Sequence, residues 1–484
     1  MRASLASSIA VTCAAVLALP VSLTVPAAAS APPAAALALP PAPELPGSTQ
    51  SLPLEPLGAA NRALGGAAGS GEQGLGRRDV RPFSLVGVVW NDPKVPLHGT
   101  VQVRTRAAGG GAWSEWQDVE THNEEHGADP GTAEGSARAL RGSTAPLWVG
   151  DSDGVEIRVR GEERLPAGLR LELVDPGEAP AAAPERTAPE ETGPERTAPE
   201  RTAPERTAPE ETGPQPRSAM APAALAGMSD AEVEASAVNA ELAPYGATWI
   251  PALSKEETER EVRNMPQSQA VRAAQAAAAA KPYIGPQPKI ITRKGWGADE
   301  SIREKGFVYT KTIKAAFVHH SATGNNYTCK QAPSVLRSIY RYHVKSSGWR
   351  DFGYNFAVDK CGNIYEGRAG GVAKPVMGAH TLGFNTNSMG IAVLGTFTKS
   401  TPPAAVVTAV ARLTAWKLGL HGVNPKGTSY LVSGGGNLFK KGTTVRFNAI
   451  AGHRDGFATE CPGGRLYSKL GTARTSSAQF QGRP

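Results

Sequence analysis

The sequence predicts a multidomain chain: an all-β, sandwich-like N-terminal domain, a C-terminal α/β domain with a central sheet, and long disordered linkers. The length of 484 residues allows roughly two or three domains. The 40 Pro and 54 Gly indicate that much of the chain is not packed core. Residues 81–176 alternate apolar and polar side chains, whereas residues 286–484 mix short apolar strands with helical periodicity.

The first 31 residues have the pattern of a secretory signal peptide. Arg2 precedes an apolar stretch from Ile9 to Val25, and the small residues 27–31 follow at once. An uncleaved anchor is the alternative, but the small residues favour cleavage. We therefore expect a secreted protein with no integral membrane segment after cleavage, because no later apolar run reaches the ~20 residues that a bilayer span needs.

Three further segments have the composition of linkers. Residues 32–80 are rich in Pro, Ala and Gly, and are predicted to be disordered. The predicted linker 177–217 contains pentamers of the Pro-Glu-Arg-Thr-Ala type over residues 184–213, which favour an extended polyproline II spacer. Residues 218–285 are Ala-rich, and we interpret them as marginal helix plus linker.

The predicted β domain spans residues 81–176. Its apolar–polar alternation is punctuated by Gly, Asp and Pro, as expected for half-buried strands joined by turns. Two interpretations of its tryptophans stay open: a face on which sugars stack, or core filling (Trp90, Trp113, Trp116 and Trp148). The segment shows no catalytic constellation.

Charge separates the C-terminal domain from the rest of the chain. Residues 1–285 carry 24 Lys and Arg against 36 Asp and Glu, whereas residues 286–484 carry 27 against 8. So basic a domain implies an anionic partner: nucleic acid, a membrane surface or an acidic wall polymer. The export signal and the lack of a nucleic-acid motif argue against nucleic acid. A merely solvated basic surface is the other interpretation.

The C-terminal domain contains two groups of potential metal ligands. A buried strand, Lys314–Ala322, ends in His319 and His320, and a turn-rich segment holds His453 and Cys461. Imidazole and thiolate are both good zinc ligands, and three protein ligands leave a fourth position for water, as in catalytic sites. The alternatives are that the histidines are core groups and that Cys461 forms a disulfide.

The cysteine count is compatible with this zinc site. Signal cleavage would leave Cys329, Cys361 and Cys461. Three cysteines in an exported protein leave one unpaired. Cys329 and Cys361 flank a predicted helix and are candidates for pairing, which would leave Cys461 for the metal.

Residues 290–470 resemble the peptidoglycan recognition protein family and its zinc-dependent N-acetylmuramoyl-L-alanine amidase members. The layout of signal, β domain, Pro-rich linker and amidase domain is similar to that of the actinobacterial branch. The resemblance implies a central mixed sheet with about three helices and an open substrate groove. It rests on these motifs: Trp296-Gly-Ala-Asp-Glu-Ser301, Val318-His-His-Ser-Ala322, Gly348-Trp-Arg-Asp-Phe-Gly-Tyr-Asn-Phe356, Gly362-Asn-Ile-Tyr-Glu-Gly-Arg368, Gly378-Ala-His380, Asn387-Ser-Met-Gly390 and Gly452-His-Arg-Asp455 with Thr459-Glu-Cys-Pro-Gly463.

By this resemblance, His319, His453 and Cys461 would hold Zn²⁺, which lowers the pKa of bound water from 15.7 towards about 7. Tyr354 corresponds to the family's catalytic tyrosine, and it would donate to the developing oxyanion or orient the attacking water. Thr459 corresponds to a position that is Thr in many members.

Two further residues are assigned by the same motifs. His380 corresponds to a groove histidine that contacts substrate. Asp455 is expected either to orient a ligand histidine or to cap its turn.

The implied function is a secreted, wall-associated zinc hydrolase that cleaves the amide between N-acetylmuramic acid and L-alanine of peptidoglycan. The alternative is a non-catalytic peptidoglycan-binding protein that uses the same groove; the ligand set together with Tyr354 favours the enzyme. Anionic wall polymers are the expected partners of the basic surface. The loop after Arg368 is longer than in animal members, so no stem-peptide specificity is inferred from it.

Overall fold

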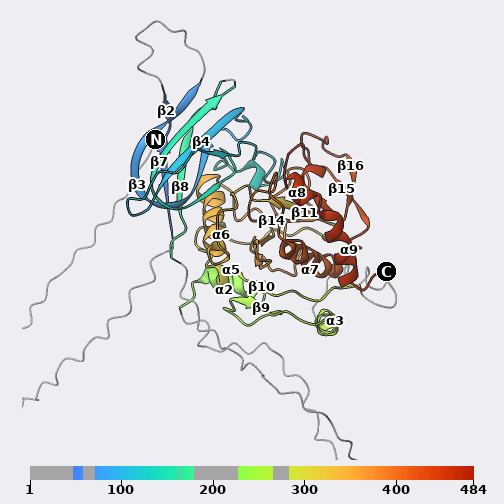
Figure 1. Ribbon diagram of the computed structural model, residues 1–484. Helices are drawn as coiled ribbons and strands as arrows, with labels where there is room; N and C mark the ends of the chain where they lie inside the picture. The colour runs from blue at the N-terminus through green and yellow to red at the C-terminus, as the bar shows by residue number, and fades with distance from the viewer. Residues whose placement is uncertain (1–46, 58–70, 163, 179–226, 265–282) are drawn as a thin grey trace, which may run out of the picture. The chain divides into compact units, whose positions relative to one another are not determined.

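A computed structural model describes residues 47–57, 71–162, 164–178, 227–264 and 283–484, which all lie in one compact unit, Leu45–Pro484 (Figure 1). The predicted signal peptide and the pentamer repeats lie outside the described residues. No helix in the described ranges combines the length and apolarity required to cross a membrane.

The N-terminal domain is all-β, as predicted. Its strands run in the order β1-β8-β3-β7-β4-β5, and the short β2 and β6 pair with β3. The long strands β3 and β7 pair with each other through several register shifts, and each also pairs with other strands. The bounds are β1 Ser48–Pro53, β2 Glu55–Pro56, β3 Glu72–Trp90, β4 Gly99–Ala107, β5 Gln117–Val119, β6 Gly142–Ser143, β7 Leu147–Gly161 and β8 Arg170–Asp175.

This sheet begins earlier in the chain than the sequence indicated. Strand β1 and the first part of β3 lie before residue 81, within the 32–80 segment that was expected to be disordered. Strand β1 has little alternation of its own and is held by antiparallel pairing along β8, from Ser48 opposite Asp175 to Pro53 opposite Arg170. Its partner is more than a hundred residues away, so the local sequence carries no signal for it.

The tryptophans of this domain do not form a single sugar-stacking face. Trp90 and Trp148 are buried. Trp113 and Trp116 lie under guanidinium groups, with Arg104 4.8 Å and Arg158 4.2 Å from the Trp116 ring centroid. Cation–π contacts of this kind stabilise the strand surface and already cover the ring faces.

The C-terminal domain is built on a mixed seven-stranded sheet, which confirms the α/β prediction. The order is β17-β11-β14-β12-β13-β10-β9; β11 is parallel to β14 and β17, and β12 is antiparallel to β13. The bounds are β9 Trp249–Ile250, β10 Ile290–Ile291, β11 Ala315–His320, β12 Phe356–Val358, β13 Ile364–Glu366, β14 Ser388–Val393 and β17 Ile450–Gly452.

The main helices of this domain are α6 (Ala332–Arg341), α7 (Ala404–Leu420) and α9 (Leu470–Phe480), in agreement with the three expected. Helix α7 is buried along most of its length, from Val406 to Leu420, and it packs on α9. Strands β15 (Thr428–Val432) and β16 (Thr444–Asn448) form a separate hairpin. The shorter helical pieces are α5 Arg293–Trp296, η3 Cys329–Gln331, η4 Tyr342–Ser346, η5 His453–Asp455 and α8 Gly464–Tyr467.

The described part of the 218–285 segment belongs to the C-terminal domain and is more than a linker. It forms α2 (Asp230–Ala237), edge strand β9 and α3 (Lys255–Asn264). Asn239 donates to Glu366 Oε1 at 2.9 Å and accepts from the Val372 N–H at 2.9 Å. These hydrogen bonds to distant residues hold the segment against the C-terminal domain. The composition of the segment gives no sign of them.

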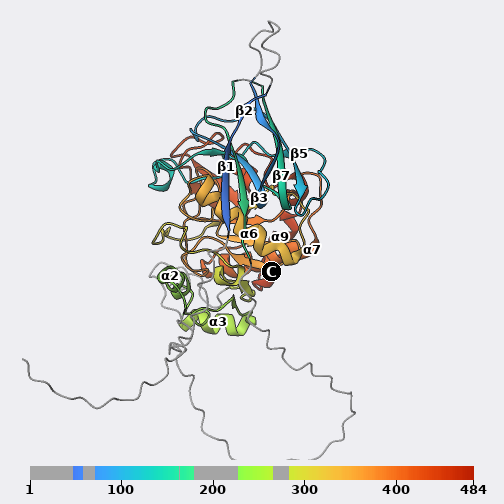
Figure 2. The ribbon, with the colours of Figure 1, turned by 90° about the vertical axis from the view of Figure 1, so that its left-hand side faces the viewer.

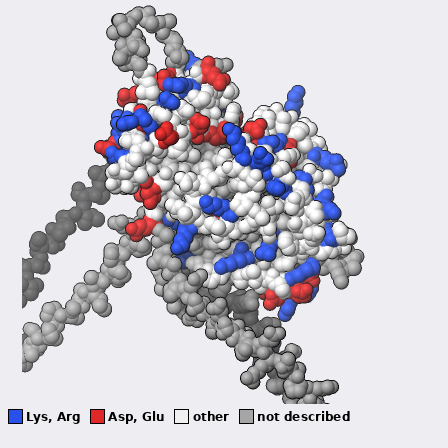
Figure 3. Space-filling model, in the orientation of Figure 1, with Lys and Arg blue, Asp and Glu red and all other residues white. Residues whose placement is uncertain are grey.

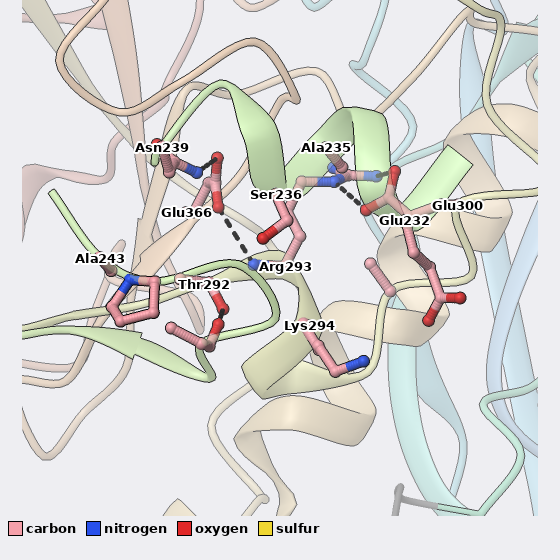
Figure 4. A pocket seen from close by; sticks show the side chains of 13 residues that line it. Glu232, Ala235, Ser236, Asn239, Ala243, Thr292, Arg293, Lys294, Glu300 and Glu366 are labelled. Carbon is pink, nitrogen blue, oxygen red and sulfur yellow. Dashed lines mark hydrogen bonds and ion pairs between the residues drawn. The ribbon is translucent and has the colours of Figure 1, made fainter. Parts of the chain in front are cut away.

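A small cavity lies between α2 and α5 (Figure 4). Its volume is about 30 Å³, the space of roughly one water molecule. The Arg293 guanidinium lies beside it, paired with Glu300 at 2.6 Å and with Asp351 at 3.1 Å, all buried. Buried ion pairs of this kind hold local structure in place. We therefore interpret this cavity as a packing feature of the fold and not as a ligand site.

The two domains share a hydrophobic core. Leu85, Val89, Trp148 and Val174 of the β domain pack with residues of α6 and its neighbours, and Figure 2 shows α6 behind the strands. Gly87 permits this approach, since a Cβ there would lie 2.5 Å from Tyr342 Cζ. The C-terminal domain therefore shares part of its core with the β domain.

Cys329 and Cys361 form a disulfide, whereas Cys461 is free and buried. The bond closes a loop of sequence separation 32, for which loop-closure entropy gives about 3–4 kcal/mol of stabilisation. We expect the Cys329→Ser/Cys361→Ser double variant to lose about this much free energy of unfolding in a urea titration. Reduced wild type should match it; an oxidised wild type no more stable than the double variant would contradict the prediction.

Candidate metal centre

Four potential ligands converge beside the C-terminal edge of the central sheet. One donor atom each of His126, His319, His453 and Cys461 lies within 4.8 Å of all the others. His319 is the next-to-last residue of strand β11, and His453 directly follows β17. Because these strands are parallel neighbours with Val318 opposite Gly452, the two imidazoles lie side by side, with ring centroids 4.4 Å apart.

The structure thus brings together the three residues predicted as zinc ligands. Cys461 Sγ lies 3.8 Å from His319 Nδ1, close to the roughly 3.3–3.6 Å that separates donor atoms around tetrahedral zinc. Both ring nitrogens of His453 are buried without a hydrogen-bond partner among the described residues. Orphaned buried nitrogens are costly unless a ligand satisfies them, so the donor set fits a zinc ion.

Burial sets the protonation of these groups. It lowers the pKa of His319 and of His453 well below 6.5, so both imidazoles are neutral at neutral pH, the form that binds a metal. It raises the pKa of the Cys461 thiol well above 9. Binding of a metal would therefore release the thiol proton.

A short polar chain orients His319. Thr381 Oγ1 lies 3.3 Å from His319 Nε2 and 3.0 Å from His380 Nδ1. With Nε2 engaged in this way, Nδ1 of His319 faces Cys461. Partners that fix the tautomer of a ligand histidine in this manner tune metal affinity.

His380, which its motif assigns to substrate contact, lies against Thr381 in the structure. Its side chain is 0% exposed and is absent from the lining of the cavity beside the cluster. The structure instead connects it through Thr381 to His319. Direct contact with substrate would require His380 to become exposed, so the placement favours an orienting role.

Tyr354 and Thr459 both lie at the cluster. The Tyr354 ring centroid is 5.2 Å from that of His319, and burial raises the pKa of Tyr354 well above 10, which keeps the phenol protonated. Thr459 Oγ1 accepts the Cys461 N–H at 3.1 Å. It also donates to Glu125 Oε1 at 2.6 Å.

Asp455 caps its own turn, one of the two roles anticipated for it. Its carboxylate accepts the Gly452 N–H at 2.9 Å and the Tyr467 hydroxyl at 2.6 Å. These contacts hold the turn that carries His453. His343 is a packed residue, since its ring stacks on Trp349 at 4.3 Å.

A cavity of about 480 Å³ lies next to the cluster. Tyr354, Thr459 and Cys461 line it from the C-terminal domain, and residues between Glu120 and His126 line it from the β domain. The cavity is therefore closed on one side by a segment outside the predicted amidase domain.

Sequence reasoning missed His126 and Glu125. They lie in the connection between β5 and β6, in the domain where no catalytic constellation was found. The available signal was local: Glu120-Thr-His-Asn-Glu-Glu-His126 concentrates two histidines and three carboxylates outside any alternating strand. Nothing in it indicated a partner more than 300 residues away.

The chain was compared with known families and proteins. Residues 309–464 match the family model described as N-acetylmuramoyl-L-alanine amidase, and residues 33–208 match the one described as Rv3811 N-terminal galactose-binding domain-like. Peptidoglycan-recognition protein SC2 of Drosophila melanogaster is 30% identical over 185 residues, 38% of this chain and 85% of that protein. N-acetylmuramoyl-L-alanine amidase of Homo sapiens is 30% identical over 201 residues, 41% of this chain and 30% of that protein.

Solved structures give similar matches. Wild-type Drosophila PGRP-LB is 26% identical and covers 38% of this chain and 92% of its own, with a TM-score of 0.30. Peptidoglycan recognition protein LE, solved in complex with tracheal cytotoxin, is 29% identical and covers 38% of this chain and 92% of its own, with a TM-score of 0.29.

Proposed function

The chain belongs to the peptidoglycan-recognition protein family, and from that premise we propose that it is a zinc-dependent N-acetylmuramoyl-L-alanine amidase. It would hydrolyse the amide between N-acetylmuramic acid and the L-alanine of peptidoglycan stem peptides. The observation that carries the proposal is the convergence of His319, His453 and Cys461 with Tyr354 at one buried centre. A non-catalytic recognition protein would have no need for this complete set.

His319, His453 and Cys461 would hold the metal, and neighbouring residues keep these ligands in position. A zinc ion bound there would supply Lewis acidity and an acidified water, with a pKa of about 7. Thr381 keeps Nδ1 of His319 directed at the centre, and Thr459 fixes the backbone of Cys461. These contacts pre-organise the site, so that little reorganisation is needed when the substrate binds.

Tyr354 supplies a hydrogen-bond donor for the developing oxyanion. Its buried phenol stays protonated at neutral pH and lies beside His319. In this position it donates a hydrogen bond to the carbonyl oxygen of the amide as negative charge develops there. Thr459, with its hydroxyl at the same wall of the cavity, orients the substrate or the attacking water.

We place this activity outside the cell, at the wall. The signal-peptide pattern of residues 1–31 supports export, and the 27 Lys and Arg against 8 Asp and Glu in residues 286–484 support affinity for anionic wall polymers. Figure 3 shows these cations spread over the visible face of the C-terminal domain. A spread of this kind suits a long polyanion better than one small anion.

The test is digestion of peptidoglycan by the full chain, with zinc, with a chelator, and with zinc restored. We expect new L-alanine amino termini without new reducing sugar ends, and only in the zinc-containing samples. The same assay on His126→Ala guards against inhibition by the segment that closes the cavity. Binding to the wall without release in both proteins would reject the enzyme and favour the recognition protein.

A further inference from the structure

Residues 120–136, here called the strap, cross from the β domain to the metal centre. The strap lies in the connection from β5 to β6 and contains the short 3-10 helix η2 (Glu134–Ser136). Glu125, Asp129 and Glu134 within it are each less than a tenth exposed. Three buried carboxylates in one connecting segment indicate specific partners, because unpaired buried charges are strongly destabilising.

The first contact that attaches the strap to the C-terminal domain is made by the carboxylate of Asp129. Asp129 Oδ1 accepts from the Gly383 N–H at 2.8 Å and from Asn385 Nδ2 at 2.7 Å. The Asn385 side chain also donates to Gly127 O at 2.8 Å. The 383–385 turn follows Thr381, which orients His319, so the strap is fixed next to the metal centre.

The second attachment is an ion pair at the end of the strap. Arg368 donates to both oxygens of Glu134, at 2.8 and 2.9 Å, and both side chains are buried. Bidentate pairs of this type are strong and fix geometry. Both anchors follow His126 in the chain, and they give the strap a defined position beside the cavity.

Just before these anchors in the chain, His126 enters the metal centre. Its Nε2 lies 3.9 Å from Cys461 Sγ, and its ring centroid lies 4.6 Å from that of His453. Its Nδ1 is buried with no hydrogen-bond partner in the described part of the chain.

Glu125, which precedes His126 in the strap, engages the hydroxyl of Thr459 in the cavity wall. Glu125 accepts the Thr459 hydroxyl at 2.6 Å and, through its backbone oxygen, the Leu382 N–H at 2.9 Å. A substrate that needs Thr459 must displace Glu125. The strap therefore contacts both the ligand cluster and a polar group of the cavity.

We propose that His126 is a fourth protein ligand of the metal and that the strap holds the enzyme in a latent, closed form. The inference rests on the proposed function for the existence of the zinc site, and it goes beyond it in assigning the N-terminal domain a direct part in that site. A three-ligand zinc centre keeps its fourth position open for water, whereas four protein ligands make a closed centre. Activation then consists of withdrawing the strap, with water replacing the His126 imidazole.

The experiment uses the full chain loaded with Co²⁺, whose absorption spectrum reports thiolate ligation and coordination geometry. Azide serves as a probe that binds only where a position is open. We expect the wild-type spectrum to be insensitive to azide, and the spectra of His126→Ala and His126→Gln to change with it. His98→Ala is the matched control, because His98 is an exposed histidine of the same β domain that belongs neither to the cavity lining nor to the ligand cluster; it should behave as wild type.

Peptidoglycan digestion by the zinc-loaded proteins provides the second measurement. If the strap is closed in roughly nine of ten molecules, its release raises turnover about tenfold. His126→Ala should accordingly bind zinc more weakly than wild type and yet release L-alanine termini faster. Damage to the fold would lower both the zinc affinity and the rate at which L-alanine termini are released.

The possible failures are distinguishable. Lack of a Cys461-dependent charge-transfer band in wild type would overturn both the proposed function and the strap. A normal band with azide sensitivity already present in wild type, or with none in either His126 variant, would overturn the strap alone. Because His126→Gln retains most of the packing volume, a fold defect confined to His126→Ala leaves the test intact.

Discussion

Cys461→Ala should reduce the zinc affinity of the full chain by more than ~10²-fold and bring amidase activity to the background of the chelated sample. Loss of a residue that merely supports a ligand costs about 10–100-fold in metal affinity, and Cys461 is a direct ligand in this account. It is also the only member of the cluster that contributes negative charge to the metal. The measurement is zinc titration against a competing chelator, followed by digestion of peptidoglycan by the same samples.

The control for this variant is the chain that lacks the disulfide. Cys329 and Cys361 are bonded to each other and do not belong to the cluster. Their double serine variant should lose stability and retain zinc. Unchanged zinc affinity in Cys461→Ala would contradict the ligand assignment, whatever the activity.

Tyr354→Phe should lower kcat by about 10²–10³-fold, the usual effect of removing one oxyanion donor. Zinc affinity should stay at the wild-type level, because the phenol is not a ligand in this account. KM should change little, since the hydrogen bond strengthens only as charge develops on the substrate. Steady-state kinetics on a soluble muramyl peptide, with zinc titration in parallel, separates these quantities.

Tyr327→Phe is the matched control for loss of a phenol. Tyr327 is as buried as Tyr354, but its hydroxyl donates to Leu394 O at 3.2 Å and it belongs neither to the cluster nor to the cavity lining. This variant should lose some stability and keep its kcat. Equal kcat values for Tyr354→Phe and wild type would remove Tyr354 from the chemistry.

The architecture was accessible from sequence wherever the signal is local. The buried run Ala315–His320 and the run Ile450–Gly452 are apolar enough to indicate interior strands. Parallel pairing of two such strands then brings their C-terminal ends, and with them His319 and His453, to one edge. The motifs added Cys461 and Tyr354, which the structure places at the same centre.

What the sequence did not reveal depends on long-range pairing. Strand β1 is defined by β8 and not by its own pattern. Helix α2 and strand β9 become part of the C-terminal domain through contacts such as that of Asn239 with Glu366. His126 belongs to the same class, since its relation to Cys461 is set by the anchors Asp129 and Glu134 and by no spacing along the chain.

The most direct test of the metal centre is X-ray absorption at the zinc edge of the zinc-loaded full chain. The account predicts one sulfur at about 2.3 Å and imidazole nitrogens at about 2.0–2.1 Å, with three nitrogens in wild type and two plus a water oxygen in His126→Ala. A zinc environment with no sulfur would contradict the account, because it would remove Cys461 from the metal and with it the proposed site.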